Sequence, residues 1–139
     1  MKRILIVDDS RVFQRIMEQT LSTQYQIVGK ANNGDEGFNL FKQLNPDLVL
    51  LDIVMPDCNG KQCLEMIMKY DSNASVIMVS SVGDDKTIND CLQLGAKAFI
   101  CKEEISRILN PGESKLIQAV DQIFSYTGQS EAAWKLTLD

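Results

Sequence analysis

The sequence has no histidine, and acidic residues outnumber basic ones. Without histidine, Ser-His-Asp and Cys-His catalysis, histidine metal sites and histidine pH switches are all excluded. Lys and Arg number 14 against 19 Asp and Glu, which gives a formal charge of -5. Because binding to a nucleic-acid backbone depends on basic residues that neutralise phosphates, we expect no nucleic-acid partner. No apolar run approaches the roughly 20 residues of a membrane span, so we expect no membrane insertion.

The cysteines do not form a metal-binding or redox motif. They are Cys58, Cys63, Cys91 and Cys101. No two have the C-x-x-C spacing, and no histidine is available to complete a zinc site. At the N-terminus, Asp8 and Asp9 end the first apolar run after four residues, which is too short for a signal peptide. We therefore expect reduced thiols in a cytoplasmic protein.

Short apolar runs alternate with amphipathic stretches along the chain. The runs that predict strands are residues 4–7, 25–30, 48–51, 76–79 and 98–101. The residues that recur at helical spacing are Val12, Phe13, Ile16, Met17 and Leu21; Phe38, Leu40, Phe41 and Leu44; Cys63, Leu64, Ile67 and Met68; Ile88, Cys91, Leu92 and Leu94; and Leu116, Ile117, Val120, Ile123 and Phe124. This order predicts one α/β domain over residues 1–125 and a polar tail over residues 126–139.

Strands that alternate with helices are typical of a parallel sheet with helices on both faces. The unbroken apolar runs favour the same fold class, because strands buried on both faces need no polar alternation. We expect the crossover connections to be right-handed, as in other doubly wound α/β proteins.

Polar residues follow four of the five predicted strands. Asp8 and Asp9 follow the first strand, Asp52 the third, Ser80 the fourth and Lys102 the fifth. In open α/β sheets, ligands bind outside the carboxyl ends of the strands. We therefore expect these carboxylates, the hydroxyl and the ammonium group to meet at one edge of the sheet.

Neighbouring carboxylates repel each other, and a hard divalent cation such as Mg²⁺ relieves that repulsion. Mg²⁺ takes about six oxygen ligands and usually keeps several waters. Asp9, Asp52 and the backbone carbonyl of Val54 are the candidate ligands, and Asp8 would hold them or a water in place. A carboxylate beside bound Mg²⁺ is suited to accept a phosphoryl group. Lys102 and the Ser80 hydroxyl would then contact phosphoryl oxygens.

Four stretches of the sequence resemble the response-regulator receiver domain. They are Val7-Asp8-Asp9-Ser10, Leu51-Asp52-Ile53-Val54-Met55-Pro56, Val79-Ser80-Ser81 and the stretch from Gly95 to Lys102. They occur in that family's order, each at the end of a predicted strand, and the resemblance covers about residues 2–125. It implies a flavodoxin-like sheet with strand order 2-1-3-4-5.

The resemblance also implies a role for each site residue. These roles are Asp52 as the acceptor of a phosphoryl group from a histidine kinase, Asp8 and Asp9 as the acidic pair, Lys102 as the phosphate partner, Ser80 as the switch hydroxyl and Phe99 as the switch aromatic. Ser80 would move toward the phosphoryl group and leave space into which Phe99 rotates. Val54 and Val82 are apolar at positions that flank the phosphoryl group in this family, so we expect them to slow its hydrolysis.

The sequence departs from the family after the lysine. Glu103 stands where proline is usual, so we expect a trans peptide bond there, and the aim of Lys102 does not follow from the resemblance. The segment from Glu103 to Pro111 is also longer than is usual. Its apolar residues at helical spacing, which predict an extra helical turn, are Ile105, Ile108 and Leu109.

The function implied is a signalling switch and not an enzyme, since the domain catalyses only its own Mg²⁺-dependent phosphorylation and dephosphorylation. The phosphorylated form would change its affinity for a separate partner, such as the flagellar motor switch of a chemotaxis pathway, a phosphatase or a phosphotransfer protein. We expect a monomer. Alternatives within the family are a phosphorelay intermediate, a fragment of a longer regulator and a receiver that accepts no phosphate.

Two alternatives come from other classes of protein. A flavodoxin-like electron carrier shares the fold, but Asp8 and Asp9 would repel a flavin phosphate after the first strand. An aspartate-nucleophile phosphatase needs a second aspartate two residues after Asp52, where this chain has Val54.

Overall fold

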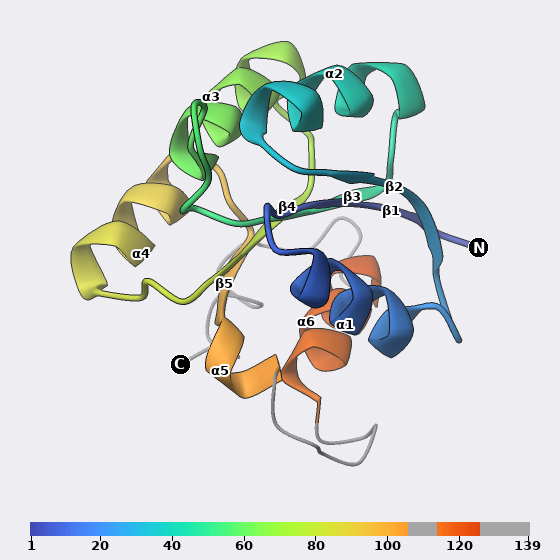
Figure 1. Ribbon diagram of the computed structural model, residues 1–139. Helices are drawn as coiled ribbons and strands as arrows, with labels where there is room; N and C mark the ends of the chain where they lie inside the picture. The colour runs from blue at the N-terminus through green and yellow to red at the C-terminus, as the bar shows by residue number, and fades with distance from the viewer. Residues whose placement is uncertain (106–113, 126–139) are drawn as a thin grey trace.

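The computed structural model describes residues 1–105 and 114–125 and contains a five-stranded parallel sheet of order β2-β1-β3-β4-β5. The strands are β1 (Arg3–Val7), β2 (Gln26–Ala31), β3 (Leu48–Leu51), β4 (Val76–Ser80) and β5 (Ala98–Cys101). The helices are α1 (Arg11–Leu21), α2 (Gly34–Leu44), α3 (Gly60–Tyr70), α4 (Asp85–Gln93), α5 (Lys102–Ile105) and α6 (Lys115–Ser125). The expected α/β fold and strand order are confirmed (Figure 1).

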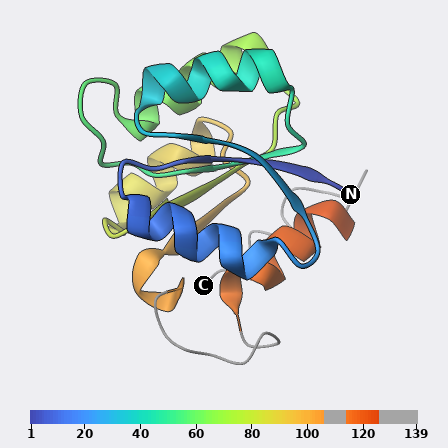
Figure 2. The ribbon, with the colours of Figure 1, turned by 45° about the vertical axis from the view of Figure 1, so that its right-hand side comes forward.

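Helices cover both faces of the sheet, and each face has its own core. Helices α1 and α6 lie on one face and α2, α3 and α4 on the other (Figures 1 and 2). Neighbouring strand residues alternate between the two: Ile4 and Ile6 belong to the first core, Leu5 and Val7 to the second. All four are fully buried, which explains why the strand has no polar alternation.

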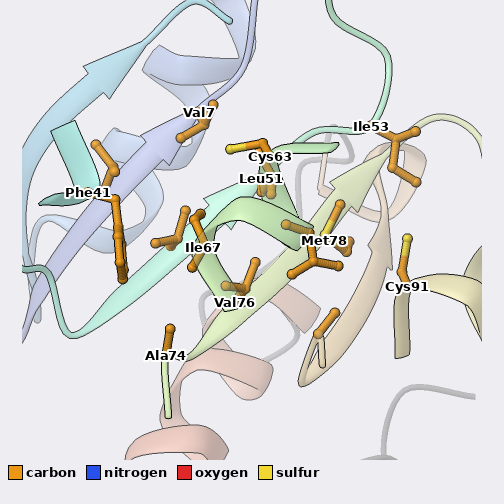
Figure 3. Packing of buried hydrophobic residues seen from close by; sticks show 14 of the residues in the cluster. Val7, Phe41, Leu51, Ile53, Cys63, Ile67, Ala74, Val76, Met78 and Cys91 are labelled. Atoms are coloured by element: carbon orange, nitrogen blue, oxygen red, sulfur yellow. The ribbon is translucent and has the colours of Figure 1, made fainter. Parts of the chain in front are cut away.

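The core beneath α2, α3 and α4 combines strand and helix residues (Figure 3). Strands β1, β3 and β4 contribute Val7, Leu51 and Met78, while Phe41 comes from α2 and Ile67 from α3. Burying one large aliphatic side chain contributes about 1.5–3 kcal/mol, so this layer stabilises the packing of the helices on the strands.

Four helices begin at a polar cap residue beside the carboxyl edge of the sheet. The cap residues are Ser10, Asn33, Asn59 and Asp84. Each side chain accepts a hydrogen bond from a backbone N–H of the first helical turn, which fixes where the helix starts. In α3, Gln62 also accepts from the Asn59 N–H at 3.1 Å, which completes a capping box.

The structure differs from the sequence-based expectation in two elements. In α1, Val12 is 68% exposed, and Gln14 is buried with Met17 and Leu21 instead. The helical repeat places residues 14, 17 and 21 on one face, which turns Val12 outward. Strand β2 begins and ends one residue later than expected, and Tyr25, just before it, donates a hydrogen bond from its hydroxyl to Asp121 of α6.

The region after β5 is described only in part. Helix α5 forms the first turn of the expected extra helix, whereas Ile108, Leu109 and the tail over residues 126–139 lie outside the described residues. Within residues 1–105 and 114–125, no helix is long and apolar enough to cross a membrane.

Gly60 allows the start of α3 to contact the end of β3. A Cβ atom on Gly60 would lie 2.0 Å from the Asp52 carbonyl oxygen and 2.6 Å from the Ile53 Cα atom. Because backbone atoms cannot yield as a side chain does, we predict that Gly60→Ala lowers the free energy of unfolding by about 3 kcal/mol in urea titrations.

Gly29→Ala is the matched control. Its Cβ atom would lie 2.9 Å from Cδ1 of Leu44, the mobile end of a flexible side chain. We expect a loss of about 1 kcal/mol or less. Equal losses in the two variants would contradict the role given to Gly60.

Candidate functional site

The ammonium group of Lys102 lies between two buried carboxylates at the carboxyl edge of the sheet. Its Nζ is 2.9 Å from Oδ2 of Asp8 and 3.0 Å from Oδ2 of Asp52. The Lys102 side chain is 12% exposed, against 0% for Asp8 and 4% for Asp52. Val7 pairs with Leu51 in the sheet, so the aspartates that follow them lie side by side.

Backbone N–H groups hold one oxygen of each carboxylate. Ser10 donates to Oδ1 of Asp8, and Ile53 donates to Oδ1 of Asp52, both at 2.8 Å. The other Asp8 oxygen, Oδ2, lies 2.9 Å from Nζ of Lys102 and has no second partner among the described residues. Lys102 therefore compensates both Asp8 Oδ2 and Asp52 Oδ2 with one positive charge.

Burial and charge shift the pKa values of this group. Burial raises the pKa of Asp8, and the charge of Asp52 adds to that effect, while Lys102 and the Ser10 N–H oppose it. Burial alone would lower the pKa of Lys102, but its hydrogen bonds and charge interactions with Asp8 and Asp52 hold that pKa above its ordinary value. Lys102 therefore stays charged and compensates one of the carboxylates.

Asp9 completes a cluster of carboxylates that fits a divalent cation. One oxygen each from Asp8, Asp9 and Asp52 lies within 4.8 Å of the others. Among the residues that the structure describes, the three carboxylates and the Lys102 ammonium sum to two net negative charges. Oxygen ligands and this negative charge both suit Mg²⁺, and the exposed Asp9 opens the cluster to solvent. The Val54 carbonyl as a ligand stays a prediction.

Ser80 and Phe99 lie deeper along the neighbouring strands. Ser80 is fully buried at the end of β4, pairs with Cys101 of β5, and its Oγ accepts from the Val82 N–H at 3.2 Å. Phe99 is 7% exposed and belongs to the core beneath α2, α3 and α4. A Cβ atom on Gly83 would lie 3.8 Å from its ring, so Phe99 lies under the connection from β4 to α4. Their switch roles stay predictions.

Two site residues of α1 were not expected from the sequence. The Gln14 amide donates to the Asp8 carbonyl at 2.6 Å and to the Ala31 carbonyl at 3.2 Å, which ties β1 to β2 at the edge of the site. The Phe13 ring centroid lies 4.5 Å from Nζ of Lys102. The sequence did offer one indication of these two residues. Both lie one turn after the Ser10 cap, and the first turn of α1 lies over the carboxyl edge of the sheet.

Glu103, which stands where the family usually has proline, does not displace the Lys102 side chain. No cis peptide bond occurs within the described ranges, so the Lys102–Glu103 bond is trans, as expected. Lys102 is the first residue of α5 and still reaches both aspartates.

The described cysteines are free thiols, and burial raises the pKa of Cys63 to about 12.

Comparison with known proteins agrees with the resemblance seen in the sequence. Residues 4–110 match the response regulator receiver domain. Chemotaxis protein CheY of Thermotoga maritima is 42% identical over 103 residues, which cover 73% of this chain and 85% of that protein. Protein CcdB of Bacillus subtilis is 35% identical over 127 residues, 91% of this chain and 100% of that protein.

A solved structure shows the same fold. It is the CheX-CheY-BeF3-Mg+2 complex from Borrelia burgdorferi, with a TM-score of 0.79, 36% sequence identity, and coverage of 88% of this chain and 89% of that chain.

Neutralising Asp8 tests whether its charge strains the metal-free site. We predict that Asp8→Asn raises the free energy of unfolding at neutral pH by about 1 kcal/mol, because a buried charge beside Asp52 is removed while Lys102 keeps Asp52 as its partner. The raised pKa of Asp8 means that the wild type loses stability as pH rises from the ordinary aspartate range through that raised value. The advantage of Asp8→Asn should therefore shrink toward acid pH.

Urea unfolding in EDTA at a series of pH values measures this difference. Adding Mg²⁺ should then stabilise the wild type more than Asp8→Asn, because binding to the folded state alone adds stability. Asp9→Asn is the control: its exposed carboxylate carries little strain, but the variant should lose the Mg²⁺ effect. A less stable Asp8→Asn at neutral pH would contradict this account.

Proposed function

This chain belongs to the response regulator receiver family, and from that premise we propose that it is a phosphorylation-driven signalling switch with Asp52 as its phosphoacceptor. The observation that carries the proposal is the Lys102 ammonium 3.0 Å from the Asp52 carboxylate, within a cluster of carboxylates suited to Mg²⁺. A nucleophile, a fixed cation and a metal site are the parts that phosphoryl transfer to a carboxylate requires.

In the proposed reaction, an Asp52 oxygen attacks the phosphorus of a phosphorylated histidine on a kinase. The new P–O bond forms as the P–N bond breaks, and its electron pair stays on the imidazole nitrogen. The hydrogen bond from the Ile53 N–H and the contact with Lys102 orient the carboxylate before attack. Mg²⁺, held by Asp9 and Asp52 with Asp8 beside them, would offset the negative charge of the incoming group.

Lys102 has a part after transfer as well. Its Nζ contacts the Asp52 oxygen that faces it, so the same ammonium lies within reach of a phosphoryl group on that residue. The phosphoryl group adds about -1.5 to -2 charge, which strengthens its attraction for Lys102. The Ser80 hydroxyl, from the adjacent strand, would donate to a second phosphoryl oxygen.

The output would come from a shift between two arrangements around β4 and β5. If Ser80 turns toward the phosphoryl group, its hydrogen bond from the Val82 N–H is lost and the connection to α4 is released. Phe99 lies directly beneath that connection, near Gly83, and would turn inward with it. The face formed by α4, β5 and α6 would then bind its partner with changed affinity.

The proposed setting is a two-component chemotaxis pathway in the cytoplasm. The relatives named CheY are chemotaxis proteins, and the Borrelia structure holds such a protein with CheX. By analogy, the partners of this chain would be a histidine kinase and a downstream protein such as the motor switch or a phosphatase. We assign residues 1–125 to the receiver domain, and apart from its own phosphorylation and dephosphorylation we assign it no catalysis.

Intact mass after incubation with Mg²⁺ and acetyl phosphate tests the phosphoacceptor. We predict one added phosphoryl group on the wild type and none on Asp52→Ala or in EDTA, because the carboxylate and the metal are both required. Asp47→Ala, which removes an aspartate that accepts from the Arg3 N–H at the opposite end of the sheet, is the matched control and should gain the group normally.

A phosphoryl group on the Asp52→Ala variant would show that another residue is the acceptor. No adduct on the wild type, with acetyl phosphate and with a purified histidine kinase alike, would refute the proposed function.

The rate of phosphate loss tests the two valines at the rim of the site. Val54 is 56% exposed and Val82 is 38% exposed, so both side chains can be exchanged without disturbing the core. We predict that Val54→Asn with Val82→Gln speeds loss of the phosphoryl group about tenfold, because polar side chains can orient an attacking water. The rate of phosphate release after removal of the donor measures this loss. An unchanged rate would contradict the prediction that the two valines slow hydrolysis.

A further inference from the structure

The Phe13 ring covers the ammonium group of Lys102. The ring centroid lies 4.5 Å from Nζ, within the range of a cation–π contact. We propose that Phe13 is a positioning residue: its ring holds the Lys102 ammonium between Asp8 and Asp52 and so sets the rate of phosphoryl transfer. The kinetic part of this inference rests on the proposed function, whereas the contact itself does not.

A ring contact limits the freedom of the Lys102 side chain beyond what its two ion pairs do. A lysine side chain has a flexible four-carbon stem and a point charge, unlike the rigid fork of an arginine. Glu103 stands where the family usually has proline, and Lys102 opens a helix of only four residues. The ammonium thus has three contacts: the carboxylates of Asp8 and Asp52, and the face of the Phe13 ring.

The position of the ring is coupled to the position of Asp8. The Ser10 N–H donates to Oδ1 of Asp8 at 2.8 Å, and the Phe13 N–H donates to Oγ of Ser10 at 3.3 Å. Gln14, the next residue, donates to the Asp8 carbonyl at 2.6 Å. The first turn of α1 is thus fixed to the strand end that carries Asp8, and the ring is fixed relative to the carboxylate that it faces across Lys102.

Phe13 also packs against the core beneath α1 and α6, so its effect on packing has to be separated from its effect on Lys102. The electrostatic part depends on the negative face of an aromatic ring, which leucine lacks and tyrosine keeps. Phe13→Leu therefore removes the attraction while it fills most of the space. Phe13→Tyr retains the attraction.

The first measurement needs neither metal nor phosphodonor. In carbon-13-labelled protein, the ε-methylene protons of Lys102 should resonate upfield of the other lysines because of the ring current of Phe13. Absence of the signal in Lys102→Arg assigns it. We expect the upfield shift to be lost in Phe13→Leu and kept in Phe13→Tyr.

The second measurement is the rate of phosphorylation by acetyl phosphate with Mg²⁺. We expect Phe13→Leu to react about fivefold more slowly than the wild type, and Phe13→Tyr within about twofold of it. If the leucine variant does not fold, Phe13→Met fills the same space with a flexible apolar chain and takes its place.

Phe38→Leu is the matched control. Nζ of Lys42 lies 4.4 Å from the Phe38 ring centroid, an equivalent contact within α2. This variant should shift the Lys42 signal and leave both the Lys102 signal and the phosphorylation rate unchanged.

An unshifted Lys102 signal in the wild type would overturn the inference, as would a leucine variant that reacts like the wild type or a tyrosine variant that reacts as slowly as the leucine variant. A shifted Lys102 signal in a wild-type protein that gains no phosphoryl group would support the contact and refute the proposed function, so the two failures are distinguishable.

Discussion

The contact of Lys102 with Asp8 and Asp52 places one positive charge between two buried negative charges at the carboxyl edge of the sheet. Burying either carboxylate without a partner would cost several kcal/mol. The charge balance stays incomplete, however, because Asp9 adds a third carboxylate to the two that Lys102 contacts. A site that is compensated only in part attracts a divalent cation, and a phosphoryl group on Asp52 would in turn attract Lys102.

The fold delivers this arrangement through the parallel sheet. Strands β1 and β3 are neighbours, so the residues that follow Val7 and Leu51 come side by side, and β4 and β5 bring Ser80 and Lys102 to the same edge. The connections that follow are fixed by helix caps and by Gly60, whose lack of a side chain lets α3 begin against β3. Strand ends thus carry the charged groups, and capped helix starts hold the connections beside them.

Much of this site could be predicted from the sequence, because each of Asp8, Asp52 and Lys102 is the first polar residue after an apolar run. That rule depends only on strand direction. It cannot identify Phe13 and Gln14, because these residues lie on α1 and belong to the site through their side-chain contacts with Lys102 and the Asp8 carbonyl. Helical spacing predicted Val12 on the apolar face of its helix. In the structure Gln14 is buried on that face, and Val12 points to solvent. The aim of Lys102 needed the structure, since Glu103 removes the local constraint usual in the family.

A crystal structure with Mg²⁺ and beryllofluoride, a mimic of a bound phosphoryl group, would test the central claim most directly. The account predicts beryllofluoride on an Asp52 oxygen, with fluorine atoms in contact with Nζ of Lys102 and Oγ of Ser80, and one Mg²⁺ held by Asp9 and Asp52. A site that stays empty at saturating Mg²⁺ and beryllofluoride, or an adduct that Lys102 does not contact, would contradict it.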